Sequence, residues 1–153
     1  MQKRFKITPA SYLILRKNDK ILMLRRFNTG YEDGKYSFIA RHLDGKETFT
    51  QAIIREAKEE ANITLKSKNL KVVHIMNRHV PTNDKDLRER VDVFFIAEKW
   101  EGTIKNMEPN KCDDLKWFDV DKLPKNIIPY IKTVINNVRK KIYYSEFGFK
   151  NNL

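Results

Sequence analysis

Three glutamates spaced three and four residues apart constrain this chain more than any other feature. Glu56, Glu59 and Glu60 stand in residues 55–64 and share one face if that segment is helical. Like charges at these spacings repel by about 0.2–0.5 kcal/mol per pair. Asn62, which follows them, is a typical helix stop, near which anions are unfavourable. A divalent cation would remove both penalties, and ligands that are all oxygen suit Mg²⁺ or Mn²⁺.

These glutamates also border the packed side of the expected helix. A stripe of apolar residues runs beside the carboxylate face and not opposite it: Ile53, Ile54, Ala57 and Ala61. Carboxylates at such a boundary are costly unless they have a partner. A run of glutamates on a helix is otherwise usually a solvated face. Gly45 and Glu47, which come just before the helix, favour a functional interpretation over a solvated face.

The spacing of the charged residues resembles a known signature. Glu47 is followed by seven residues and then by the run Arg55-Glu56-Ala57-x-Glu59-Glu60-x-x-Ile63. This pattern is similar to the signature of the Nudix (MutT-like) hydrolases, G-x5-E-x7-R-E-U-x-E-E-x-G-U, where U is a bulky aliphatic residue. Every charged position matches, Ile63 fits the last aliphatic position, and Ala57 is a small occupant of the first.

The resemblance implies a fold, a cofactor and a set of metal ligands. We expect an α/β protein with the Nudix-type α/β/α sandwich and a mixed β-sheet, formed by residues 1–153 as a single domain. Members of the family bind divalent cations, so Mg²⁺ is the expected cofactor and Mn²⁺ an alternative. The implied ligands are Glu56, Glu59, Glu60 and a backbone carbonyl near Ala40.

The resemblance also implies catalytic roles around the metal. Arg55 would pair with Glu47 and hold the loop and helix rigid, which orients the ligands without touching the substrate. A carboxylate would accept a proton from the attacking water. Glu60 is the first candidate for this general base, and Glu89 or Glu98, in a later segment, is the second.

Two glycines of the signature are missing, and they differ in consequence. Asn62 replaces the last one, and asparagine tolerates the left-handed conformation of a helix cap. Arg41 replaces the first, in a turn that brings a carbonyl toward the metal in family members. We expect a side chain there to strain a backbone that glycine would leave free, and its charge to compete with a bound cation. The open alternatives are that Arg41 points to solvent or holds a substrate phosphate.

Residues ahead of the signature are the candidates for substrate binding. The set combines basic and aromatic side chains, and it includes the arginine at the position of the first signature glycine: Arg26, Phe27, Tyr31, Tyr36 and Arg41. Arginine can hold a phosphate through two parallel hydrogen bonds. Packing in the core is the common alternative for each aromatic ring.

Charge and cysteine content restrict the partners and the compartment. The formal net charge of +11 is compatible with polyphosphate substrates and with nucleic acid, although a composition rich in lysine also produces it without a function. Cys112 is the one cysteine, so no internal disulfide can form. The apolar runs are too short to span a bilayer. We therefore expect a cytoplasmic protein without a membrane partner, either a monomer or a homodimer.

Periodicity and turn residues predict strands and two helices. The expected strands are 10–16, 20–26, 36–39, 70–78, 90–100 and 114–118, with the polar stretch 81–89 as a connection. The first helix covers 50–61 and is capped by Thr48 or Thr50. The second begins after Pro129 and ends near Tyr143.

Three functions are consistent with these features. The first is a Mg²⁺-dependent hydrolase that cleaves a pyrophosphate linkage in a nucleoside diphosphate linked to another group, such as a nucleoside triphosphate or a related small nucleotide. The second is an enzyme that removes pyrophosphate from an RNA 5′ end, which the basic charge favours. The third is a non-catalytic nucleotide-binding protein, in which Arg41 has replaced an essential glycine.

Overall fold

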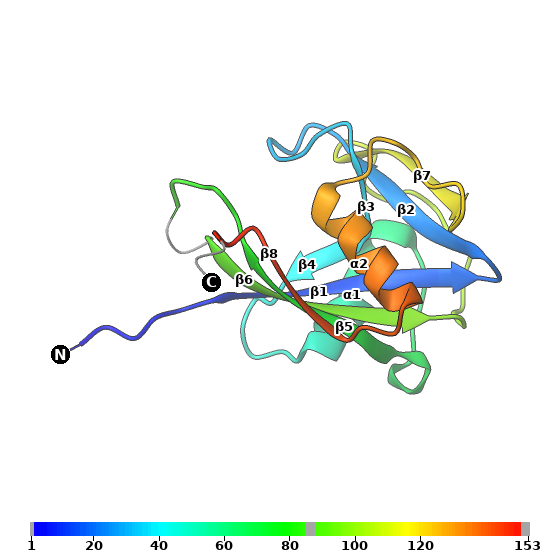
Figure 1. The fold of residues 1–153 in the computed structure, drawn as a ribbon. Coiled ribbons are helices and arrows are strands. Elements are labelled where there is room, and N and C mark those ends of the chain that lie inside the picture. The colour runs from blue at the N-terminus through cyan, green and yellow to red at the C-terminus, as the bar shows by residue number, and fades with distance from the viewer. Residues whose placement is uncertain (1, 85–87, 151–153) are drawn as a thin grey trace.

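The computed structural model describes residues 2–84 and 88–150. Eight strands form one mixed sheet in the order β3-β2-β1-β6-β5-β8, with β4 also paired to β1 and β7 to β2 (Figure 1). The strands are β1 (Thr8–Lys17), β2 (Lys20–Arg26), β3 (Tyr36–Ser37), β4 (Ile39–His42), β5 (Lys71–His79), β6 (Glu89–Ala97), β7 (Cys112–Asp119) and β8 (Tyr144–Phe147). The helices are α1 (Phe49–Ala61) and α2 (Pro129–Arg139), with a short 3₁₀ helix, η1 (Ser67–Asn69). In the described part of the chain, neither α-helix is long and apolar enough to cross a membrane.

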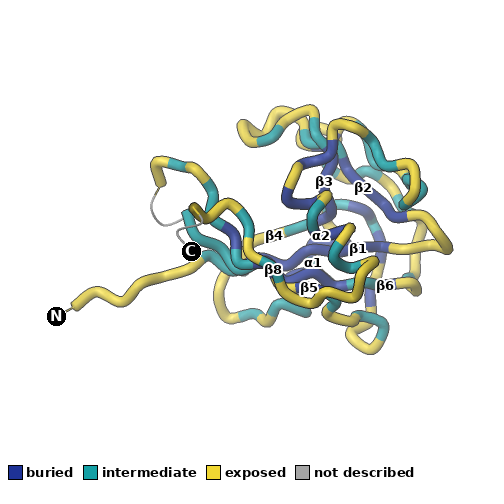
Figure 2. Tube along the Cα trace, viewed as in Figure 1, coloured by how far each residue is buried: buried dark blue, intermediate teal, exposed yellow. Residues whose placement is uncertain are grey.

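The two α-helices cover opposite faces of the sheet, and the side chains of β1 show why. Successive residues of a strand point to opposite faces. Leu13 and Leu15 pack in one buried cluster with Ile53 of α1, whereas Tyr12 packs in the other with Ile131 of α2. Figure 2 shows β1 as a buried strand between the two helices. This arrangement confirms the expected α/β/α sandwich with a mixed sheet.

Most predicted elements are present with small changes at their ends. β2 has the predicted bounds, whereas the expected strand at 36–39 is divided into β3, which pairs with β2, and β4, which pairs with β1. The cap of α1 is Thr48: its Oγ1 accepts from the Gln51 N–H at 3.0 Å, and the Gln51 side chain accepts from the Thr48 N–H at 2.9 Å. Residues 85–87 of the predicted connection lie outside the described residues.

The prediction for the last helix is wrong at its C-terminal end. α2 ends at Arg139 and not near Tyr143. Lys141 has a φ of 58°, a left-handed conformation that no α-helix continues through. Residues Tyr144–Phe147 instead form β8, parallel to β5. Such pairing joins segments that are far apart in the sequence, and local periodicity does not detect it.

Candidate functional site: a carboxylate cluster in a cleft

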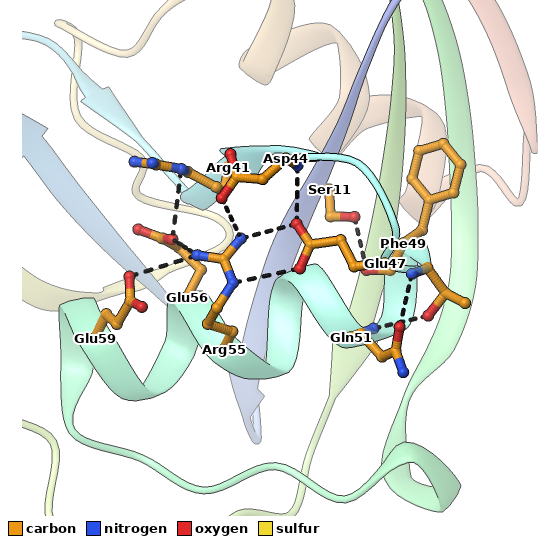
Figure 3. Close-up of polar contacts among 10 residues, drawn as sticks. Ser11, Arg41, Asp44, Glu47, Phe49, Gln51, Arg55, Glu56 and Glu59 are labelled. Carbon is orange, nitrogen blue, oxygen red and sulfur yellow. Dashed lines mark hydrogen bonds and ion pairs between the residues drawn. The ribbon is translucent and has the colours of Figure 1, made fainter.

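Arg55 lies at the centre of a group of carboxylates (Figure 3). Its Nη2 and Nε donate to the two carboxylate oxygens of Glu47, at 2.9 and 3.3 Å. Its Nη1 lies 3.4 Å from Glu56 Oε2 and 3.6 Å from Glu59 Oε2, and its Nη2 lies 3.3 Å from Asp44 Oδ2. One guanidinium therefore ties the loop before α1 to the helix, and the expected pair with Glu47 is present.

A second group of carboxylates faces the interior. Glu56 is only 1% exposed, and one oxygen each of Glu56, Glu60 and Glu108 lie within 4.8 Å of one another. Glu108 comes close because the chain before it is bound to the end of α1, where the Met107 N–H donates to the Glu60 carbonyl at 3.0 Å. Three carboxylate oxygens at such separations form a donor set of the kind that divalent cations bind.

Burial controls the ionisation of this cluster. It raises the pKa of Glu60 well above the ordinary value for glutamate, and the negative charge of Glu56 raises that pKa further. Burial also raises the pKa of Glu56. Glu60 Oε2 has no hydrogen-bond partner within the described residues. A buried carboxylate oxygen without a partner is costly, so these side chains fit a cation better than they fit one another.

Glu59 lies apart from the three-carboxylate cluster. An α-helix turns by about 100° per residue, so Glu60 returns to within about 40° of Glu56, whereas Glu59 is about 60° away on the other side. Its side chain is 50% exposed and lies beside Arg55. The structure thus brings two of the three implied ligands together and places the third next to the guanidinium.

Glu108 was missed by sequence reasoning. No local signal marks it, because its position depends on the contact between its segment and the end of α1. Among the described residues, the later candidates Glu89 and Glu98 are outside the three-carboxylate cluster. Glu98 is 65% exposed and lies 4.0 Å from Arg16 instead.

The cluster opens onto a cleft of about 780 Å³. Of the residues expected to contact substrate or metal, the lining includes Arg26, Tyr31, Ala40, Arg41 and Glu60. Acidic and basic groups therefore share one cavity, whose size lies within the usual range for small-molecule sites.

Two expected substrate residues lie outside this lining. Phe27 is 46% exposed, on the loop that follows β2. Tyr36 is buried in the core, where its hydroxyl donates to Asp114 and its ring meets Phe118 edge to face. For Tyr36 the alternative of core packing therefore describes its position, because β3 faces the interior.

Arg41 occupies an unstrained position. It lies in β4, paired with Ser11 of β1, and it is not among the residues with positive φ. The expectation of a strained backbone at this residue is therefore wrong. Its charge remains relevant, since its Nε lies 3.9 Å from Glu56 Oε2 with the arginine side chain 46% exposed.

Comparison with known proteins identifies the family. A sequence model described as the NUDIX domain matches residues 6–138. The chain belongs to the Nudix family. It is 29% identical over 119 residues to the NAD-capped RNA hydrolase NudC of Chromobacterium violaceum, covering 78% of this chain and 40% of that one. It is 29% identical over 129 residues to the ADP-ribose pyrophosphatase of Methanocaldococcus jannaschii, covering 84% of this chain and 71% of that one.

Solved structures agree on the fold. The MutT Nudix hydrolase of Burkholderia pseudomallei superposes with a TM-score of 0.77 at 20% identity, covering 86% of this chain and 98% of that one. The MutT protein of Methanosarcina mazei superposes with a TM-score of 0.75 at 15% identity, covering 92% and 98%. These likenesses show the fold of a Nudix hydrolase, a family that generally uses divalent cations.

We expect Glu60→Gln to stabilise the metal-free Nudix domain at neutral and alkaline pH. A carboxyl whose folded pKa is raised contributes stability below its unfolded pKa and loses it as the pH rises through the folded value. The variant therefore melts roughly 2–4 °C above wild type at pH 8, and the difference disappears near pH 4. Thermal melting against pH measures this. Glu59→Gln is the control, because that side chain is half exposed and its neutralisation relieves no burial of charge. Equal rises of the melting temperature in both variants would contradict the buried, charged state assigned to Glu60.

We expect Glu47→Gln to weaken divalent-cation binding without abolishing folding. The hydrogen bonds from Arg55 lower the pKa of Glu47, so it stays ionised at neutral pH and fixes the guanidinium beside Glu56. Loss of such an orienting contact typically lowers metal affinity about 10- to 100-fold. Calorimetric titration with Mn²⁺ measures this, and Glu101→Gln, at an exposed pair with Lys66, is the control. Unchanged affinity in Glu47→Gln would show that the pair orients nothing.

Proposed function

We propose that this protein is a Mg²⁺-dependent pyrophosphohydrolase that cleaves a nucleoside diphosphate linked to another group. The observation that carries the proposal is the cluster of Glu56, Glu60 and Glu108, with a buried unpartnered oxygen on Glu60, facing a cleft that also holds arginines. Carboxylates suit the metal, and arginines suit the phosphates of the substrate.

The ligand set of the proposal is Glu56, Glu60, Glu108 and the carbonyl of Ala40, with Mg²⁺ as the cation and Mn²⁺ as an alternative. Such a cation, when bound, neutralises charge on a pyrophosphate and lowers the pKa of water. Arg55 holds the Glu56 carboxylate in place from outside the cleft. Glu59, which the resemblance implies as a ligand, is half exposed beside Arg55 and is not part of this set.

Glu60 remains our candidate for the base that takes the proton from the attacking water. Its carboxylate lines the cleft and belongs to the three-carboxylate cluster, where a water on the cation would lie. Glu108 replaces Glu89 and Glu98 as the second candidate, because it lines the cleft and lies within the cluster.

The names of the relatives support the substrate class. An ADP-ribose pyrophosphatase and a NAD-capped RNA hydrolase both have substrates in which a nucleoside diphosphate is linked to a further group. This favours such linked diphosphates over simple nucleoside triphosphates. Removal of an RNA 5′-end group is the second candidate function, which the net charge of +11 and the NudC relatives favour.

A non-catalytic nucleotide-binding protein is the third candidate, and the carboxylates count against it. Three glutamates in one cluster, one of them 1% exposed, destabilise the fold unless a cation compensates them. The support for this alternative was that Arg41 would strain the backbone and that its charge would oppose a cation. The backbone is unstrained, so only the argument from charge remains.

A turnover screen tests the proposal. ADP-ribose, NAD, nucleoside triphosphates and RNA with a 5′-triphosphate or a NAD cap are incubated with Mg²⁺ or Mn²⁺, and the released phosphates are quantified. We expect hydrolysis of at least one linked diphosphate, with loss of about 10²–10⁴-fold in kcat in Glu60→Gln and a measurable loss in Glu108→Gln. Wild-type turnover in both variants, or no turnover of any substrate, would contradict the proposal.

We expect Arg41→Gly and Arg41→Met to tighten Mg²⁺ binding by a similar factor, about fivefold, and to raise kcat/KM at low Mg²⁺. The reason is charge: a cation about 4 Å from a ligand opposes the metal by about 1 kcal/mol even in water. Because the backbone is unstrained, glycine gains nothing over methionine. Kinetic titration of Mg²⁺ at fixed substrate separates the outcomes. Slower turnover in both variants would instead make Arg41 a substrate contact.

A further inference from the structure

The far side of the cleft gathers a second group of charged residues. Strand register places them on one face of the sheet: Arg78 of β5 is opposite Arg90 of β6, and Asp92, two residues further along β6, is opposite Ala10 of β1. Ala10 is also opposite His42 of β4. Arg78, Arg90 and His42 all line the cleft. Two guanidiniums and one carboxylate are therefore held together, and this carboxylate is not part of the three-carboxylate cluster.

Arg78 is fully accounted for by contacts within the protein. Its side chain is 3% exposed, its Nε donates to Asp92 Oδ2 at 2.6 Å, and its Nη2 donates to the Tyr12 hydroxyl at 3.1 Å. The guanidinium also lies 3.7 Å from the centre of the Tyr130 ring. Its Nη1 lies 3.5 Å from the Tyr31 hydroxyl, so each nitrogen has a partner, and Arg78 and Asp92 form a structural pair in the floor of the cleft.

Arg90 lies beside that pair but has no carboxylate of its own among the described residues. Its side chain is 12% exposed, and its Nε lies 3.6 Å from Asp92 Oδ1, which is too long for a hydrogen bond. Across the described ranges, both the Arg90 Nε and Asp92 Oδ1 are buried without a hydrogen-bond partner. Asp92 already neutralises Arg78, so one positive charge remains. An arginine stays protonated at all accessible pH values, and such a desolvated charge requires an anion.

Within residues 2–84 and 88–150, the neighbouring groups that line the cleft do not supply that anion. His42 is either neutral or positively charged, so its ring offers a hydrogen bond but no negative charge. Asp44, which also lines the cleft, lies 3.3 Å from Arg55. Arg41 adds a further positive charge on the adjacent residue of β4.

We propose that Arg90, on the Arg78–Asp92 floor and beside His42, is a second anion-binding site that takes a phosphate ester of the substrate other than the pyrophosphate that is cleaved. The planar guanidinium presents donors in the fork geometry that suits phosphate oxygens. A phosphate there neutralises the surplus charge and satisfies the buried Nε. The inference rests on the proposed function, since it assigns the pyrophosphate to the carboxylate side.

The position of β4 between the two groups gives the shape of the substrate. Side chains alternate along this strand, so Arg41 points toward Glu56 on the α1 side while His42 points toward Arg90 on the α2 side. Both sides open onto one cleft. A ligand that reaches both must be extended and must carry two separate anionic groups. The second phosphate is a monoester on a small nucleotide, or the phosphodiester to the next nucleotide of an RNA.

A binding experiment tests the second site separately from catalysis. The probes are AMP, adenosine 2′,5′-bisphosphate, adenosine 3′,5′-bisphosphate and the dinucleotide pApA, none of which contains a pyrophosphate linkage. With Mg²⁺ present, calorimetric titration should show about tenfold tighter binding of a bisphosphate or of pApA than of AMP, as expected for a charge-assisted phosphate contact. A preference for the bisphosphates indicates the monoester, and a preference for pApA indicates the RNA diester.

Variants at Arg90 decide whether this residue is responsible. In Arg90→Gln, the ratio of bisphosphate or pApA affinity to AMP affinity should fall to about one. In Arg90→Lys, which keeps the charge but not the forked donors, the ratio should be intermediate. The lysine variant provides the test if the glutamine variant does not fold. Arg16→Gln is the control. It removes the same charge, but Arg16 lies near the end of β1, whereas Arg90 is opposite the start of β1, and Arg16 is outside the cleft lining. This variant should keep the wild-type ratio of bisphosphate affinity to AMP affinity.

Two results would overturn the second site: equal affinity of wild type for all four probes, or a preference that persists in Arg90→Gln. Hydrolysis reports separately. If no pyrophosphate substrate is turned over by wild type while the affinity ratio depends on Arg90, the hydrolase proposal fails and the anion site stands. If a pyrophosphate substrate is hydrolysed but the affinity ratio is one, the hydrolase proposal stands and the second anion site is ruled out.

Discussion

The geometry of this site depends on one guanidinium. Arg55 bonds Glu47 with two donors and lies within ion-pair distance of Asp44, Glu56 and Glu59. Without it, Asp44, Glu47, Glu56 and Glu59 would lose the guanidinium that they share, and the carboxylates of α1 would repel one another at helical spacings. With it, the loop that follows β4 is fixed to the helix, and Arg41 of β4 lies 3.9 Å from Glu56. The proposed metal ligand Glu56 is thus oriented by a residue that lies outside the cleft lining.

The cleft is lined by glutamates on one side and by arginines on the other, and the burial of either group without a partner is unfavourable. On one side, burial raises the pKa of Glu60, which shows that its anion is poorly solvated there. On the other, Arg90 retains a buried donor that the described residues do not satisfy. Both imbalances reduce the stability of the free protein. In our proposals a cation and an extended anionic ligand would correct both imbalances, and the stability that the free protein lacks would then be recovered as binding energy.

The parts that could be predicted from the sequence are those set by local spacing. The i+4 relation of Glu56 and Glu60, the reach from Glu47 to Arg55 and the cap at Thr48 need only the geometry of one helix and its preceding loop. The parts that could not be predicted depend on contacts between distant segments. Glu108 enters the cluster through the end of α1, and β8 exists because β5 offers it an edge. The role of Arg90 depends on Arg78, which strand register places opposite it on β5, and on Asp92, which both arginines approach.

The substitution of the signature glycine by Arg41 shows how far a motif can be trusted. A glycine is required only where φ is positive or the backbone is approached closely. Here the residue lies in an extended strand, where an arginine costs no backbone strain. The side chain, half exposed, leaves the carboxylate cluster intact. A chain that had lost its cation would gain stability by replacing Glu56, Glu60 or Glu108 with neutral residues, since buried like charges are costly. All three carboxylates are present, so the departure at Arg41 changes the electrostatics of the proposed cation site and removes none of its carboxylates.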